Sequence, residues 1–209
     1  MLSAIEALEQ LREGNARFVS DTRASEALTD QFRRTQVATG QEPFAVILGC
    51  SDSRVPGEII FDQGLGDLFV IRVAGNIVAP SQIGSVEFAA ERFGTRLVVV
   101  LGHSKCGAVS ATLEELGRPS EAQSRNLQSI VDRIRPAVEP LLAAGGASLP
   151  EADLLKLAVR ANIRASVNQL RHGSEMVEDL IQRDGLLVVG AEYSLETGVV
   201  EFFEGMPRR

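Results

Sequence analysis

The sequence predicts a single α/β domain: a central, mostly parallel sheet of four strands, an antiparallel edge strand, and helices on both faces. Apolar runs at residues 44–48, 97–101 and 186–191 are continuous rather than alternating, which is typical of strands buried on both faces of a parallel sheet. Segments with apolar residues at steps of three and four indicate helices. Glu196-Thr197-Gly198 has the composition of a hairpin turn, so residues 199–203 should form an antiparallel edge strand.

The composition is that of an ordinary globular protein, with 44% hydrophobic and 23% charged residues. A chain of 209 residues is long enough to bury a full core. We therefore interpret residues 1–209 as one domain, with an N-terminal helical arm over residues 1–39 and an α/β core over residues 40–206.

Charge and hydropathy exclude several classes of partner. The net charge is −7 and there is no basic run, so we predict no nucleic-acid partner. No apolar stretch approaches the roughly 20 residues of a membrane span, and the first residues lack the basic head and apolar run of a signal peptide. We therefore expect a cytoplasmic protein. In that reducing compartment its two cysteines are better suited to metal binding or catalysis than to a disulfide.

Two helices are expected before the first strand. Ser3-x-x-Glu6 indicates a capping box that opens the first helix, and a second helix is predicted from about residue 25 to residue 39, ending at Gly40. Because both precede the first strand, neither can be a crossover helix of the sheet, and we expect neither to have a place on it. The apolar residues on one side of the first helix are Ile5, Leu8, Leu11 and Phe18.

The first half of the core should alternate strands with helices, as parallel pairing requires. The predicted strands are residues 44–48, 68–72 and 97–101, and the predicted helices are residues 56–61, 83–93 and 106–116.

The second half of the core begins with a segment rich in glycine and proline, residues 117–150, where we predict a helix near residues 123–138 and then a surface loop. A long helix should follow, because apolar residues again recur at steps of three and four. A shorter helix over residues 174–183 and the turn Asp184-Gly185 precede the fourth strand. The residues of the long helix's apolar face are Leu155, Val159, Ile163, Val167 and Leu170.

Two short motifs carry the chemistry: Cys50-Ser51-Asp52-Ser53-Arg54 and His103-Ser104-Lys105-Cys106. Each follows a predicted buried strand. If these strands are parallel neighbours, the motifs emerge at the same carboxyl edge of the sheet, which is where α/β sheets bind ligands. Two thiols and one imidazole would then form a tetrahedral zinc site with one open position, as catalytic zinc sites have.

Each of these residues also has a plainer interpretation. Cys50 alone could be a small buried hydrophobic residue, and His103 alone a hydrogen-bonded core histidine. Asp52 and Arg54 could be an ordinary surface ion pair, although their position after a ligand favours a buried bidentate pair. The matching positions of the two motifs favour the metal site. His172, the other histidine, is predicted to be a solvated residue at a helix end.

Two further features belong to this edge. The helix that begins near Cys106 should point its amino-terminal N–H groups at that thiolate and favour the ionised sulfur. Gly107, directly after the last ligand, is suited to close approach of a substrate to the backbone.

At these motifs the chain resembles the β-class carbonic anhydrases. Their signature, C-x-D-x-R followed some fifty residues later by H-x-x-C, is present without a substitution, and the resemblance covers roughly residues 1–204. It implies reversible hydration of CO2 to bicarbonate and a proton, by attack of zinc-bound hydroxide on CO2, with one Zn²⁺ per chain. The flanking matches are Gly40-Gln41-Glu42-Pro43, Phe61-Asp62-Gln63-Gly64-Leu65-Gly66-Asp67 and Arg72-Val73-Ala74-Gly75-Asn76.

The resemblance also implies roles for single residues. Asp52 would accept a hydrogen bond from the zinc-bound water while Arg54 holds Asp52 off the metal, although the sequence places Asp52 close enough to become a fourth ligand in a closed state. Gln41 would donate to bicarbonate from a neighbouring subunit. Phe69 and Phe88 fall where the plant-type branch has aromatic residues around the CO2 pocket, and could equally be core.

The same resemblance implies that the N-terminal helices pack across a partner subunit, in a homodimer or homotetramer. Three alternatives stay open at the level of sequence. The same zinc site could hydrolyse CS2 or COS, the protein could be a zinc-binding regulator without turnover, or the two cysteines could be redox-active. The lack of C-x-x-C spacing argues against the last, and the presence of Asp52 and Arg54 against the second.

Overall fold

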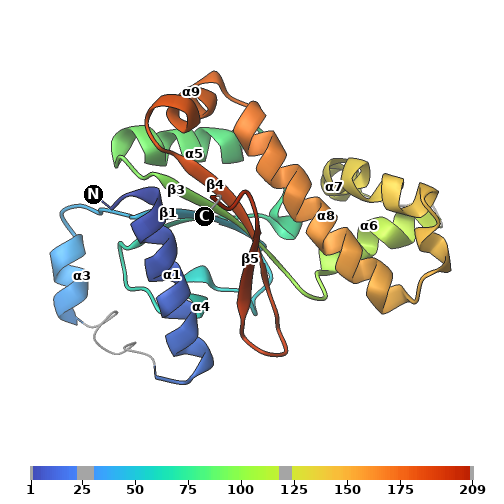
Figure 1. Ribbon diagram of the computed structural model, residues 1–209, viewed down its shortest axis with the longest axis horizontal. Helices are drawn as coiled ribbons and strands as arrows, with labels where there is room; N and C mark the ends of the chain where they lie inside the picture. Colours follow the sequence, from blue (N-terminus) through green and yellow to red (C-terminus); the bar gives the residue numbers. More distant parts are fainter. Residues whose placement is uncertain (1, 23–30, 118–123, 208–209) are drawn as a thin grey trace.

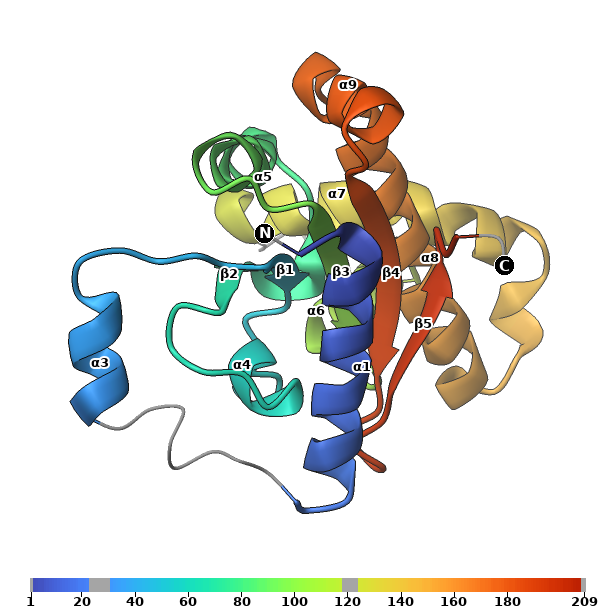
Figure 2. The ribbon, with the colours of Figure 1, turned by 60° about the vertical axis from the view of Figure 1, so that its left-hand side comes forward.

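The computed structural model describes residues 2–22, 31–117 and 124–207. Its centre is a five-stranded sheet in the order β2-β1-β3-β4-β5 (Figures 1 and 2). The first four strands are parallel and β5 runs antiparallel to β4, as predicted. The strands are β1 (Ala45–Gly49), β2 (Leu68–Arg72), β3 (Leu97–His103), β4 (Leu187–Tyr193) and β5 (Val200–Glu204).

The central strands β1 and β3 are buried at every residue, as their continuous apolar sequences predict. They are parallel neighbours, with Val46 opposite Val98 and Gly49 opposite Leu101. Both strands therefore end at the same edge of the sheet. β3 and β4 each run two residues further than predicted, because their ladder continues through the polar end to His103 opposite Tyr193.

Helices cover both faces of the sheet (Figures 1 and 2). Alternate residues of a strand face opposite sides, so Val46 and Leu48 pack in one core cluster while Ala45 and Ile47 pack in the other. The short helix α4 (Gly57–Ile60) lies on the second side with α1 (Ala4–Val19). The helices on the first side are α5 (Pro80–Arg92), α6 (Gly107–Gly117), α7 (Arg125–Ala143), α8 (Glu151–His172) and α9 (Glu175–Arg183).

Helix α7 continues five residues beyond its predicted end and passes through Pro136 and Pro140. Val131, Ile134 and Val138 on its apolar face are buried, the last two in the core cluster that contains Val46 and Leu48. This packing outweighs the loss of two backbone donors on the helix. Short 3₁₀ turns lie at Ala74–Asn76 and Gly146–Ser148.

Helix α1 begins with the predicted capping box of Ser3 and Glu6. We expected it to find no place on its own sheet, and this was wrong. Ala7, Leu8 and Leu11 are buried in one cluster with residues of β1 and β3. Ile5, expected on the apolar side, is instead exposed. A helix at the start of the chain need not be a crossover helix to cover a sheet face.

Hydrogen bonds also hold α1 against its own chain. The Asn15 side chain donates to the carbonyls of Ile60 and Gly198, at 3.1 and 2.9 Å, and accepts from the N–H of Val200 at 2.8 Å. Gly14 lies against the carbonyl of Phe61, so closely that a Cβ there would be 1.8 Å from the oxygen. α1 is thus a packed element of this fold.

Helix α3 (Gln31–Val37) confirms the C-terminal part of the second predicted helix, whereas residues 23–30 lie outside the described residues. Its residues are exposed or half-buried, and Phe32 points its ring to solvent. Arg33 holds the helix to the core by donating to the carbonyl of Leu65 at 2.9 Å and to Asp67 at 2.5 Å. Packing of α1 or α3 on a partner subunit stays a prediction.

In the part of the chain that the structure describes, no helix has the length and apolarity needed to span a bilayer.

Candidate metal centre

The carboxyl edge of the sheet brings both sequence motifs together. Cys50 follows β1 directly, His103 is the last residue of β3, and Cys106 precedes the first residue of α6. All three side chains are buried, and their ligand atoms lie within 4.8 Å of one another. Two sulfurs and one nitrogen at this spacing can hold a single metal ion.

The tautomer of His103 suits this role. Its Nδ1 is 2.9 Å from the carbonyl oxygen of Ser104, which can only accept, so Nδ1 carries the proton. The other ring nitrogen, Nε2, then presents a lone pair. Within the described residues, this buried atom has no hydrogen-bond partner. A buried acceptor that faces two thiols and has no closer polar partner fits the role of a metal ligand.

The two thiols share their ionisation. Cys106 hydrogen-bonds to the Cys50 sulfur, which also accepts from the N–H of Gly75 at 3.3 Å, and these bonds lower the pKa of Cys50. The hydrogen bond to Cys50, together with burial, raises the pKa of Cys106. The N–H groups of Ala108 and Val109, at the start of α6, oppose that rise, as predicted for a helix terminus. The shared hydrogen bond therefore favours ionisation of Cys50 over ionisation of Cys106, and a bound cation would favour the thiolate form of both.

Asp52 and Arg54 form the predicted bidentate pair. Arg54 Nε and Nη2 donate to the two carboxylate oxygens at 2.9 and 2.7 Å, and the Arg54 N–H donates to Oδ1 at 3.0 Å. These bonds hold the pKa of Asp52 well below its usual range. The expectation that the pair is buried was wrong: the Arg54 side chain is 54% exposed and Asp52 17%. The loop after β1 lies at the open edge of the sheet.

The carboxylate nevertheless lies beside the ligands, because Asp52 Oδ2 is 3.9 Å from His103 Nε2. Arg72, at the end of β2, hydrogen-bonds to the same loop. Its Nε donates to the Cys50 carbonyl at 3.0 Å and its Nη2 to the Asp52 carbonyl at 2.5 Å. In the sequence, Arg72 and Gly75 stand out only as family matches that flank the two motifs. Both act on Cys50 through backbone groups, for which a sequence pattern carries no signal.

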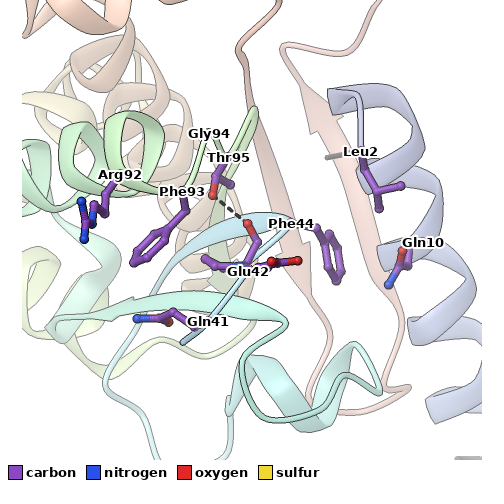
Figure 3. Close-up of a pocket in the computed structure, with 10 residues that line it drawn as sticks. Leu2, Gln10, Gln41, Glu42, Phe44, Arg92, Phe93, Gly94 and Thr95 are labelled. Atoms are coloured by element: carbon purple, nitrogen blue, oxygen red, sulfur yellow. Dashed lines mark hydrogen bonds between the residues drawn. The ribbon is translucent and has the colours of Figure 1, made fainter. Parts of the chain in front are cut away.

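The structure does not bring Gln41 to its own metal centre. Gln41 precedes β1 and Cys50 follows it, so the two lie at opposite ends of the strand. Gln41 lines a pocket of about 740 Å³, together with Phe93 and Arg92 (Figure 3).

Phe69 and Phe88 also lie away from the cysteines of their own chain. Phe69 is opposite Val46, four residues before Cys50, which is roughly 13 Å along the strand. The rings of Phe69, Phe88 and Phe93 are in mutual contact, with centroids 5.7–6.1 Å apart. Because Phe93 also lines the pocket of Gln41, these rings adjoin that pocket. Phe69 and Phe93 also pack against the core cluster that contains Val46 and Leu48, so they are core residues as well.

Gly107 is exposed at the first turn of α6, and a Cβ there would meet no atom within 4 Å. His172 lies at the end of α8, exposed and 3.2 Å from Glu178, as expected of a solvated residue.

A parallel sheet whose carboxyl edge gathers two thiols, an imidazole and an arginine-held carboxylate defines an α/β enzyme with a metal site at its strand ends. Comparison with known proteins narrows this class. Residues 45–200 match the family model described as carbonic anhydrase. The chain belongs to the β-carbonic anhydrase family, as its two motifs predict.

Individual relatives agree over nearly the full length. The carbonic anhydrase of Mycolicibacterium smegmatis is 37% identical over 197 residues, which cover 94% of this chain and 92% of that protein. The β-carbonic anhydrase CafA of Aspergillus fumigatus superposes with a TM-score of 0.75 at 26% identity, covering 97% and 91% of the two chains. The β-carbonic anhydrase of Coccomyxa gives a TM-score of 0.71 at 26% identity, covering 95% and 89%.

Proposed function

We propose that the protein is a zinc enzyme that catalyses the reversible hydration of CO2 to bicarbonate and a proton. The observation that carries this proposal is the buried cluster of Cys50, His103 and Cys106, with an unpaired Nε2 and with the Asp52–Arg54 pair at its side. Three ligands of this type suit zinc and leave a fourth position open. Bound there, zinc would supply a Lewis acid that activates water for attack on CO2.

The chain's own residues then have distinct tasks. Asp52, 3.9 Å from the ligand nitrogen, is placed to accept a hydrogen bond from the reacting water. Arg54 keeps that carboxylate ionised and turned away from the metal, since Asp52 could otherwise become the fourth ligand. Gly107, exposed directly after Cys106, would let CO2 approach the backbone closely.

Gln41, Phe69 and Phe88 complete the proposed substrate site from a second subunit. Gln41 would donate to a bicarbonate oxygen and the aromatic rings would line an apolar CO2 pocket. The support is geometric: Gln41 lies at the opposite end of β1 from Cys50, and Phe69 and Phe88 contact Phe93, which lines the pocket of Gln41. A homodimer or homotetramer follows from this proposal.

Metal analysis combined with a hydration assay tests the proposal. Purified protein should contain about one zinc per chain, and X-ray absorption should show two sulfur ligands and one nitrogen from the protein. Stopped-flow CO2 hydration should be fast, and hydrolysis of CS2 or COS slow. Oxygen and nitrogen neighbours alone, or bound zinc without CO2 turnover, would refute it.

The chain offers matched variants for this test. His103→Ala, Cys50→Ser and Cys106→Ser should each lose zinc and activity, because each removes one of three ligands. His172→Ala is the control, since this exposed histidine lies on α8 far along the chain from the cluster. It should retain wild-type zinc content and rate.

A further inference from the structure

The two residues between His103 and Cys106 form a constrained turn. The Ser104 carbonyl accepts from His103 Nδ1 at 2.9 Å and so sets the orientation of the imidazole. Lys105 has φ +54°, in the left-handed region that residues other than glycine rarely adopt. The two ligands thus converge only while this turn keeps an unfavourable backbone conformation.

Contacts from the β4–β5 hairpin hold the turn in place. The Ser104 N–H donates to the Tyr193 carbonyl at 2.9 Å, and the Ser104 hydroxyl accepts from the Leu195 N–H at 3.0 Å. That hydroxyl donates in turn to Glu196 Oε2 at 2.9 Å. The second oxygen of Glu196 lies 2.5 Å from Lys105 Nζ. A single carboxylate therefore binds both residues that separate the two metal ligands.

The Glu196 carboxylate is ionised near neutral pH. Hydrogen bonds from Lys105 and Ser104 lower the pKa of Glu196 to about 2. Ser194 is a further donor to Oε2, at 3.3 Å, and fixes the carboxylate to the hairpin itself. Glu196 touches none of the three ligand atoms, so any effect it has on the metal passes through the turn.

We propose that Glu196 is a positioning residue for the metal centre. By holding Ser104 and Lys105, it keeps His103 Nε2 and Cys106 Sγ at the separation that one metal ion requires. Groups that orient ligands in this way typically change metal affinity by about 10- to 100-fold when removed. The inference rests on the zinc site of the proposed function and adds to it a residue about ninety positions away along the chain.

Zinc affinity, measured by competition with a chelating dye, tests the inference directly. Glu196→Ala should bind zinc about tenfold more weakly than wild type. Glu196→Gln should fall between them, because its amide oxygen still accepts from Ser104 but cannot pair with the Lys105 ammonium. Glu201→Ala is the matched control: this carboxylate is on the same hairpin, is 62% exposed against 48% for Glu196, and pairs with Arg160 at 2.7 Å. It should bind zinc like wild type.

A second background tests the mechanism. Glycine adopts positive φ without penalty, so Lys105→Gly should relieve the turn, and adding Glu196→Ala should then weaken zinc binding only about threefold. Urea unfolding of the metal-free variants monitors the fold, and Glu196→Ala should unfold at the same midpoint as Glu201→Ala.

The outcomes separate the two proposals. If wild type binds zinc through two sulfurs and one nitrogen and folded Glu196→Ala binds it equally well, the inference is overturned and the proposed function stands. Equal losses in Glu196→Ala and Glu201→Ala, or the same tenfold loss in the Lys105→Gly background, overturn the inference too. A wild-type protein that binds no zinc overturns both.

Discussion

A carboxylate beside a metal site can either accept a hydrogen bond from a reacting group or become a ligand itself. In this chain Arg54 should determine which of the two Asp52 does, because its planar guanidinium donates to both oxygens of Asp52. Two parallel charge-assisted bonds orient a carboxylate better than a single ammonium could. Because Arg54 is half exposed, its contribution to folding stability is small and its effect should appear mainly in activity.

We therefore expect Arg54→Ala to bind zinc normally and to hydrate CO2 about 10- to 100-fold more slowly, since the three ligands are intact but Asp52 is free to turn to the metal. Arg54→Lys should restore little. Zinc content, hydration rate and a crystal structure of the zinc-loaded variant check this. Arg183→Ala, which removes an exposed arginine paired with Asp179, is the control. A near wild-type rate with Asp52 still off the metal would show that Arg54 does not control access.

The candidate ligands could be predicted from sequence because Cys50 and His103 each follow an apolar run and Cys106 lies three residues after His103. Parallel pairing of the two strands then brings them to one edge of the sheet. The groups that support them could not. Gly75 acts through its N–H, Arg72 through two carbonyls, and Glu196 from a hairpin turn that the sequence marks only as a turn. Their roles depend on which groups come within hydrogen-bonding distance after folding, and residue type does not encode that.

At the scale of elements, continuous apolar runs between glycines and turns placed all five strands to within about two residues. The expectation for α1 failed for a tertiary reason. Its apolar stripe shows that one side must be covered, but a stripe does not say whether its own sheet or another subunit covers it. In the sequence, Gly14 is a residue of low helix propensity within a helix. In the structure it allows α1 to pack on its own chain, because only a residue without Cβ can approach Phe61 this closely.

Two glycines inside helices should therefore respond in opposite directions to the same substitution. Gly14→Ala should lower the free energy of unfolding by about 1–3 kcal/mol, since the new Cβ meets a backbone carbonyl that cannot move aside. Gly84→Ala in α5, where a Cβ would meet no atom within 4 Å, should raise it by about 0.5–1 kcal/mol. Urea unfolding measures both. A neutral Gly14→Ala would mean that α1 does not pack on Phe61 in solution.

At the scale of the whole molecule, one chain presents two unlike halves of the proposed active site. The ligands lie at the carboxyl ends of β1 and β3, whereas Gln41 lies before β1 and shares a pocket with Phe93 (Figure 3). The five residues of β1 alone span roughly 16 Å at about 3.3 Å per residue. A glutamine cannot reach across that length, so Gln41 can meet a metal centre only in a second copy of the chain. In a twofold dimer both sites would then be completed at once.

Subunit complementation tests this arrangement. Gln41→Ala should keep its zinc but hydrate CO2 roughly tenfold or more slowly, because a hydrogen bond to a charged group contributes about 1.5–3 kcal/mol. Cys106→Ser should be inactive. A mixed dimer of the two, isolated with different tags, contains one site with both zinc and Gln41, so it should regain about half of the wild-type rate per dimer. A mixed dimer of Cys50→Ser and Cys106→Ser has no intact ligand set and should stay inactive. If the first mixed dimer is no faster than Gln41→Ala alone, or if sedimentation finds a fully active monomer, Gln41 does not act across subunits.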